Sequence, residues 1–193
     1  MPRVKLFDQE EALGKAMMLF WEQGYHNTSI QDLTEHLGIS RGSLYDTFGD
    51  KKQLYDRALA HYCEKSLMML RAFVQSQQDI KAGFRFLFQN ILSDIQNDPD
   101  HKGCFVVNTT TELLPDDPSL LEAVHRHNHS MESIFQSLLQ KGVAQGTISA
   151  DKDIKSIARS LYVFLTGLRV LGKTQTKLED SFASVEAVLA ILD

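Results

Sequence analysis

The sequence is poor in the features that stabilise secreted and membrane proteins. Two cysteines among 193 residues cannot make a disulfide framework, so we expect both thiols to be reduced. No apolar run approaches the roughly 20 residues that cross a bilayer. The start, MPRVKLF, lacks the apolar core of a secretory signal. These absences predict a cytoplasmic protein without a membrane partner.

The sequence also lacks the short motifs of common enzymes. We find no Gly-rich phosphate loop, no nucleophile elbow and no paired-carboxylate motif, and therefore predict no catalytic residue and no cofactor. His125, His127 and His129 alternate on a predicted helix, where 125 and 129 share a face and 127 points away. No further ligand is fixed nearby by spacing. The pattern favours a solvated helix face with titrating histidines over a metal site.

An excess of positive charge is missing as well. The formal net charge is −5 and the sequence pI is about 5.8, which argues against non-specific binding of polyanions by the whole molecule. Specific binding is not excluded, because a few basic groups can be concentrated on one surface.

The most informative stretch, TSIQDLTEHLGISRGSLYDTFGDKK, begins at Thr28. Thr28 and Gln31 have the spacing of a capping box and predict a helix start. Gly38 stands where a helix end needs a left-handed residue, and Ser40 can cap a second helix together with Ser43. Two short helices joined by a tight turn are typical of a helix-turn-helix, whose second helix lies in the major groove of DNA.

The second of these helices is expected to turn its polar and small side chains outward, because Leu44 and Phe48 take the inner face. Arginine can bond guanine O6 and N7, and small residues allow close approach. Lysines that open the next helix would lie on phosphates, and two basic residues near residue 1 would form a mobile arm. The expected DNA contacts are Arg3, Lys5, Thr28, Ser29, Ser40, Arg41, Gly42, Ser43, Tyr45, Thr47, Lys51 and Lys52.

The same residues carry a family resemblance. The pattern Leu37-Gly38-Ile39-Ser40-Arg41-Gly42-Ser43-Leu44-Tyr45, followed by Phe48 and by Lys51-Lys52-Gln53-Leu54, resembles the DNA-binding domain of the TetR/AcrR transcriptional regulators. Two positions depart from the family pattern: Thr34 replaces an alanine and Gln53 a glutamate, and neither removes a DNA contact. The resemblance implies a homodimer, an operator with inverted-repeat symmetry and a ligand-responsive C-terminal domain.

Helical periodicity continues through the rest of the chain. It predicts an all-α protein of about nine helices, with a helix-turn-helix domain over residues 1–50 (motif about 29–48) and a sensing and dimerisation domain over residues 51–193. A first helix should start after Asp8, and a long helix should run from Asp50 to about Ser76. Gly103 to Leu114 is rich in β-branched residues, but a lone strand would have no partner, so we predict a helix there as well.

The last two predicted helices, about 152–172 and 178–192, are apolar on more than one face, which predicts that a second subunit covers part of them. Two helices from each chain would then form a four-helix bundle, although both could instead be core helices. The expected interface is Ile157, Leu161, Phe164, Leu165, Leu168, Phe182, Val185 and Leu189.

A mixture of aromatic, methionine and hydroxyl side chains between the long helix and the last helices suits a mostly apolar pocket with a few orienting polar groups. It suits an ordinary core as well. The candidate ligand residues are Met68, Phe73, Phe84, Phe88, Phe105, Asn108, Thr109, Glu112, Phe135, Tyr162 and Phe164.

Cys104 is the sharper candidate for a sensor. It follows Gly103 at the predicted start of a helix, where the helix dipole, His101 and Lys102 would lower the thiol pKa. The Gly-Cys pair resembles the electrophile- and hypochlorite-sensing branch of the family. A small buried thiol that acts as a hydrophobic group is the alternative, and Cys63 is expected to be structural.

Together these patterns predict a sequence-specific DNA-binding regulator, a repressor released from a palindromic operator by an unknown small-molecule inducer or by an electrophile that modifies Cys104. The alternative is a helical thiol- or metal-dependent protein whose N-terminal module does not bind DNA.

Overall fold

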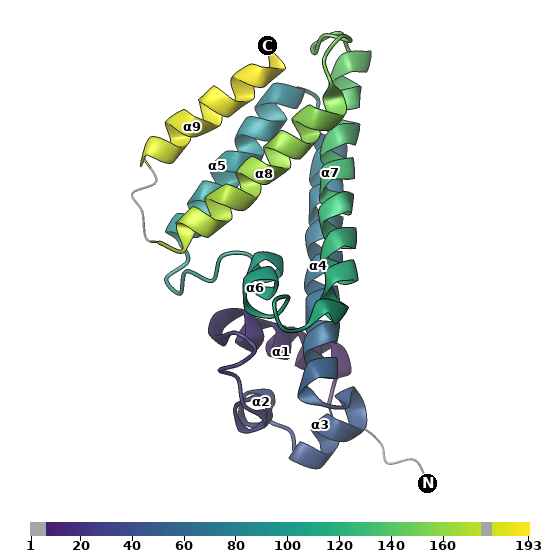
Figure 1. Cartoon of the computed structure of the whole chain (residues 1–193), viewed down its shortest axis with the longest axis vertical. Coiled ribbons are helices and arrows are strands. Elements are labelled where there is room, and N and C mark those ends of the chain that lie inside the picture. Colours follow the sequence, from purple (N-terminus) through teal and green to yellow (C-terminus); the bar gives the residue numbers. More distant parts are fainter. Residues whose placement is uncertain (1–6, 175–178) are drawn as a thin grey trace.

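The computed structural model describes residues 7–174 and 179–193, which are helical throughout apart from turns and loops and contain no strand. Figure 1 shows an elongated molecule, with the N-terminal helices at one end and the last helices at the other. The helices are α1 (Gln9–Gln23), α2 (Ile30–Leu37), α3 (Arg41–Phe48), α4 (Lys51–Ser76), α5 (Ile80–Gln96), α6 (Phe105–Glu112), α7 (Leu121–Ala144), α8 (Ile154–Gly172) and α9 (Glu179–Leu189), with 3-10 turns at Pro118–Leu120 and Ala190–Leu192. The predicted all-α fold is confirmed, including a helix rather than a strand after Gly103.

Short polar caps define the ends of α1 to α3. The Asp8 carboxylate accepts from the backbone N–H groups of Glu10 and Glu11, as expected. The capping box of α2, however, is formed by Ser29 and Asp32 and not by Thr28 and Gln31. Gly38 is left-handed at φ 65° and lets the chain turn directly into α3, a conformation that costs glycine little because it has no Cβ.

The hydrophobic core is divided into two clusters along the molecule. One cluster holds α1, α2, α3 and the first half of α4 together, and it also includes Cys104, Phe105 and Val106 at the start of α6. The second lies among α5, α7, α8, α9 and the far half of α4. Helix α6 therefore packs with the helix-turn-helix end, although it follows that end by more than 50 residues in sequence.

Helix α9 contacts the second cluster through ion pairs and apolar side chains. Arg85 on α5 donates two hydrogen bonds to the Glu186 carboxylate, at 2.6 and 2.8 Å. Lys81 pairs with Asp193. Both pairs are solvent-exposed and therefore worth little each, so the apolar contacts of Val185 and Leu189 carry most of the packing of α9.

The expected dimer interface needs a correction. Six of its eight residues are buried by the subunit itself, because α8 and α9 turn their widest apolar stripes toward α5 and α7: Ile157, Leu161, Leu165, Leu168, Val185 and Leu189. Phe182 is exposed and Phe164 is half-buried. The apolar residues left outside on α8 are instead Val163, Val170 and Leu171.

In the described ranges, none of the helices combines the length and the hydropathy that crossing a bilayer requires.

Candidate functional site

Helix α3 presents an arginine that is held in place by its neighbour one turn further on. Arg41 and Gly42 are exposed, and Tyr45 is 39% exposed. An Arg41 guanidinium nitrogen donates to the Tyr45 hydroxyl at 3.3 Å, and the guanidinium lies 5.6 Å from the centre of the tyrosine ring. Because this contact limits the side-chain rotamers of Arg41, less conformational entropy is lost when the guanidinium binds a base or a phosphate.

Four of the expected DNA-contacting hydroxyl groups have structural partners. Ser29 and Ser40 cap α2 and α3, and the Ser40 hydroxyl pairs with the Ser43 hydroxyl at 2.9 Å. Thr28 is completely buried, and its hydroxyl donates to the Gly24 carbonyl at 2.6 Å. Thr28 is therefore a core residue and not a surface contact.

Thr47 is likewise buried, at 9% exposure. The outward face of α3 therefore contains fewer residues than the sequence predicted. Arg3 and Lys5 lie outside the described residues. The exposed part of the expected DNA surface is formed by Ser29, Ser40, Arg41, Gly42 and Tyr45, beside the half-buried Ser43.

The two lysines at the start of α4 differ from each other. The Lys51 ammonium lies 4.2 Å from the centre of the Tyr25 ring, and partial burial lowers its pKa. Lys52 pairs with Asp56 at 2.6 Å and with Asp117 at 3.1 Å. Asp117 lies in the turn before α7, so Lys52 links the start of α4 to that turn. The sequence predicted a phosphate contact for Lys52, but two carboxylates already occupy its ammonium.

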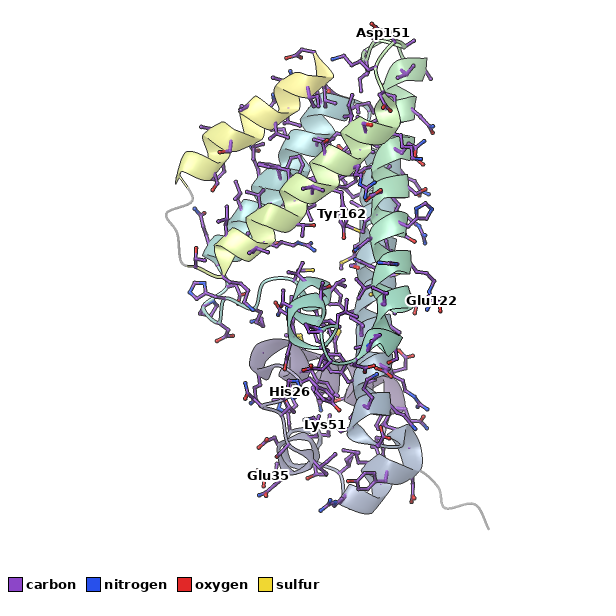
Figure 2. All side chains as sticks on the ribbon, in the orientation of Figure 1. His26, Glu35, Lys51, Glu122, Asp151 and Tyr162 are labelled. Carbon is purple, nitrogen blue, oxygen red and sulfur yellow. The ribbon has the colours of Figure 1, made fainter. Side chains whose placement is uncertain are left out.

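Helix α6 contacts the DNA-binding end of the molecule through its last residue. The Glu112 carboxylate accepts a hydrogen bond from the backbone N–H of His26 at 2.8 Å. His26 lies in the turn between α1 and α2, and Figure 2 shows it beside the N-terminal helices. The same carboxylate lies against Gly24, where an added Cβ would come within 2.9 Å of a Glu112 oxygen. Glu112 was expected in a ligand pocket, but it contacts the DNA-binding end instead.

A second contact fixes α6 to the long helix α4. The Tyr55 and Thr109 hydroxyl groups form a buried hydrogen bond of 2.8 Å, and Thr109 also donates to the Phe105 carbonyl. Tyr55 further packs edge-on against Phe20, Tyr25 and Phe105. A buried hydrogen bond with both partners satisfied fixes the position of a helix more strictly than apolar contact alone.

The other end of α6 carries a thiol that contacts an arginine. Cys104 is 4% exposed and is the N-cap residue of α6. Its Sγ accepts from an Arg169 guanidinium nitrogen at 3.3 Å and from the Tyr62 hydroxyl at 3.7 Å. Burial alone would raise the pKa of this thiol, but the Arg169 charge and the hydrogen bonds from the Val107 N–H, Tyr62 and Arg169 bring the pKa below its ordinary value. A lower pKa raises the fraction of the thiol that is ionised, and the thiolate is the nucleophilic form.

The cation beside this thiol is not the one the sequence predicted. Lys102 pairs with Asp98 at 2.9 Å and with Asp100 at 3.0 Å, so Lys102 is neutralised within its own loop. Cys63 is half-buried and free, and burial followed by the nearby Cys104 charge raises its pKa to about 12. Of the two thiols, only Cys104 therefore has a pKa below its ordinary value.

The eleven candidate ligand residues do not form one pocket. Phe84, Phe88 and Phe135 are buried in the second core cluster, and Phe105 and Thr109 are buried around α6. Three others are less enclosed, since Met68 is exposed and Phe73 and Phe164 are half-buried.

Two further candidates are more informative. Asn108 donates to the Lys102 carbonyl and accepts from the Lys173 ammonium, which is a structural role. Tyr162 lines a cavity of about 300 Å³ between α6, α7 and α8, and Figure 2 labels it near the middle of the molecule.

His127 also departs from the prediction. It is 4% exposed, its Nδ1 has no hydrogen-bond partner, and burial together with the Arg169 charge lowers its pKa to about 4. His125 and His129 are exposed, as expected. No cluster of three or more metal-ligating side chains occurs in the part of the chain that the structure describes.

Sequence reasoning missed the two most important contacts of the thiol site, Arg169 and Tyr62. A signal for Arg169 was present, because it is the one charged residue within the apolar run from Tyr162 to Gly172. A cation in such a run needs a buried partner.

Helix α3 presents an arginine within a helix-turn-helix, and α4 and α6 join this motif to a second, all-helical part of the chain. These features define a DNA-binding transcriptional regulator with a DNA-binding domain and a separate helical domain. Residues 12–58 match the profile of the bacterial regulatory proteins of the tetR family, and residues 82–189 match that of the tetracyclin repressor-like C-terminal domain. The chain belongs to the TetR family.

Individual relatives agree with this assignment. The chain is 32% identical, over the full length of both chains, to the HTH-type transcriptional regulator YezE of Bacillus subtilis. It is 28% identical to the HTH-type transcriptional repressor ComR of Escherichia coli, over 92% of this chain and 85% of ComR. A cysteine mutant of the TetR family transcriptional regulator CifR, solved with a 26-bp operator duplex, superposes with a TM-score of 0.84 at 29% identity over the whole of both chains.

Proposed function

We propose that this regulator is a homodimeric repressor that binds an inverted-repeat operator through α3 and is released when Cys104 is modified or when an inducer binds. The observation that carries the proposal is the position of α6. Its first turn begins at the activated thiol, and its last residue bonds the turn that precedes α2.

Binding as a homodimer is supported by the length of the operator duplex in a related complex and by the exposed faces of α8 and α9. The CifR mutant was solved on a 26-bp duplex, long enough for two half-sites about one helical turn apart, or about 34 Å. On α8, Val163, Val170 and Leu171 are exposed, and Phe182 is exposed on α9. Covering these apolar side chains with a second copy would remove them from water.

Modification of the thiol would change the charge balance at the start of α6. The Cys104 thiolate can add to the carbon–carbon double bond of an electrophile such as N-ethylmaleimide. A new C–S bond forms, the π electrons move to the neighbouring carbon, and that carbon takes a proton from water. The product is a neutral thioether, so Arg169 loses its anionic partner, and the added group must be accommodated beside the first turn of α6, where Cys104 is 4% exposed.

Displacement of the first turn of α6 would then be transmitted along a short, rigid helix. The Tyr55–Thr109 bond and the Glu112–His26 bond are both on α6. A shift of the eight-residue helix must therefore break these bonds or carry α4 and the α1–α2 turn with it. Either outcome changes the position of α3 relative to its counterpart in a dimer, and both helices must fit successive major grooves.

Selection of binding sites from a random pool of duplex DNA tests the DNA-binding part of the proposal. We expect an enriched sequence with inverted-repeat symmetry, bound by two chains per duplex in sedimentation analysis. Enrichment of a single half-site bound by one chain would contradict the dimeric repressor.

A further inference from the structure

The one tryptophan of the chain lines a cavity that extends to the thiol site. The cavity has a volume of about 440 Å³ and lies between α1, α4, α5, α8 and the loop at residues 97–103. Its walls are formed by Trp21, Tyr62, Ile91, Ile95, Pro99 and Arg169, and Asp94, Asp98 and Lys102 also line it. A cavity of this volume falls in the range of small-molecule sites.

Two residues that line this cavity carry hydrogen-bond donors without a full set of partners. Trp21 Nε1 is buried and has no hydrogen-bond partner, and a buried donor without an acceptor is uncommon in folded proteins. Arg169 has five N–H donors, but the structure records one hydrogen bond for it, to Cys104 Sγ. Among the described residues, no carboxylate lies within ion-pair distance of its guanidinium. The cavity is thus lined by a guanidinium whose recorded protein partner is the Cys104 sulfur and not an oxyanion.

The remaining walls limit the kind of molecule that fits. Trp21, Ile91, Ile95 and Pro99 are apolar, so the body of the molecule should be apolar. A guanidinium matches the two oxygens of a carboxylate better than any neutral acceptor. Lys102 pairs with Asp98 and Asp100, and Asp94 is exposed at the cavity without an ion pair among the described residues. A nearby negative charge favours one anionic group on the ligand over two.

We propose that this cavity binds a small monocarboxylate with a short apolar body, its carboxylate on Arg169 and its body along Trp21, Ile91 and Ile95. The ligand joins α1 of the DNA-binding end to α8 of the other end, and it competes with Cys104 for Arg169. The effect of the ligand on DNA binding rests on the proposed function, but binding of the ligand to the cavity does not.

Fluorescence of Trp21 tests the proposal directly, because this protein has no other tryptophan. Hexanoate and benzoate are titrated into the full-length, reduced protein in the absence of DNA, with hexanamide and benzamide as neutral probes of the same shape. We expect a saturable change in emission with the carboxylates, with dissociation constants on the order of 1 mM or lower. The amides should bind at least about tenfold more weakly, because the guanidinium then faces a neutral group.

Two variants locate the site. Arg169→Lys keeps the charge but loses the planar fork, and should weaken carboxylate binding by about tenfold. Asp94→Asn removes a repulsive charge from an exposed position and should tighten carboxylate binding by about twofold without changing the amides. The control is Asp151→Asn, because Figure 2 shows Asp151 at the end of the molecule opposite the N-terminal helices. It should leave all four probes unchanged.

The proposal is overturned if the emission does not saturate, if the amides bind as tightly as the carboxylates, or if Asp94→Asn behaves like Asp151→Asn. Cys104→Ser separates this inference from the proposed function. It should still bind the carboxylates, because Arg169 remains, and loss of binding in this folded variant would contradict the assignment. A regulator whose operator binding ignores thiol reagents but whose Trp21 still reports carboxylates would refute release through Cys104 and leave this inference standing.

Discussion

The Glu112 carboxylate accepts the backbone N–H of His26 at 2.8 Å, which joins the last residue of α6 to the turn before the helix-turn-helix. Cys104 lies at the opposite end of the same helix. The thiol and the DNA-binding end are therefore connected by one helix of two turns, in addition to the long helix α4. Gly24 allows the contact, because any side chain there would press on the Glu112 carboxylate.

Replacing Glu112 with alanine should weaken this connection. Removal of a charged acceptor from a backbone N–H costs about 1–2 kcal/mol, so we expect the free energy of unfolding in urea to fall by that amount. The variant should also stay on operator DNA more readily after thiol modification. Glu122→Ala removes an exposed carboxylate on α7 that pairs with Arg126 and should change stability by less than about 0.5 kcal/mol. Equal effects of the two substitutions would contradict a specific role for Glu112.

Arg41 and Lys52 should have different effects on DNA binding. Arg41→Ala should weaken operator binding by about 1–3 kcal/mol and relax the base preference at one position of each half-site. Lys52→Ala breaks the contacts with Asp56 and Asp117, so it should reduce thermal stability and leave the salt dependence of DNA binding nearly unchanged. Binding measured at several salt concentrations separates these effects. A salt slope that falls by about one for Lys52→Ala would return that lysine to a phosphate.

The helix-turn-helix could be predicted from the sequence because its signals are local. Gly38, Ser40 and the apolar spacing of α2 act within a few residues, and the structure confirms each of them. The cap of α2 was misplaced by one residue, since Thr28 and Ser29 are both good caps and burial of Thr28 decided between them. The contacts of the thiol site join residues 42 and 65 positions apart in sequence, which no local pattern specifies.

The faces of α8 and α9 illustrate the same limit. The sequence shows that both helices carry more apolar residues than one buried stripe needs. Periodicity does not say which stripe faces the subunit's own core and which faces a partner. Leu161 is completely buried, and Val163, two residues later, is 62% exposed. The direction of α8 relative to α5 and α7 decides this, and it follows from tertiary packing.

Substitutions at these two positions should therefore separate folding from assembly. Leu161→Asp places a charge in the core and should unfold the subunit or lower its melting temperature sharply. Val163→Asp should leave the fold intact but shift the protein from dimer to monomer in sedimentation velocity. Folded monomers from Leu161→Asp, or an intact dimer with Val163→Asp, would count against this assignment of the two faces.

The alkylation rate of Cys104 should depend on pH in a defined way. Because the Arg169 charge and the hydrogen bonds lower the thiol pKa despite burial, the thiolate should already form below pH 9.0 and the rate should level off there. Cys63, with a pKa of about 12, should react slowly across the same range. Mass spectrometry of iodoacetamide-treated protein measures both rates. Replacing Arg169 with methionine should move the Cys104 midpoint to higher pH, and an unchanged midpoint would remove Arg169 from the account.

The central claim is that Cys104 controls operator binding through α6. It is tested most directly by operator binding of the wild-type, Cys104→Ser and Cys63→Ser proteins, each measured before and after treatment with N-ethylmaleimide. We predict that all three bind the operator when untreated. After treatment, the wild-type and Cys63→Ser proteins should dissociate and Cys104→Ser should stay bound. Release of treated Cys104→Ser from the operator, or retention of the treated wild-type protein, would contradict the account.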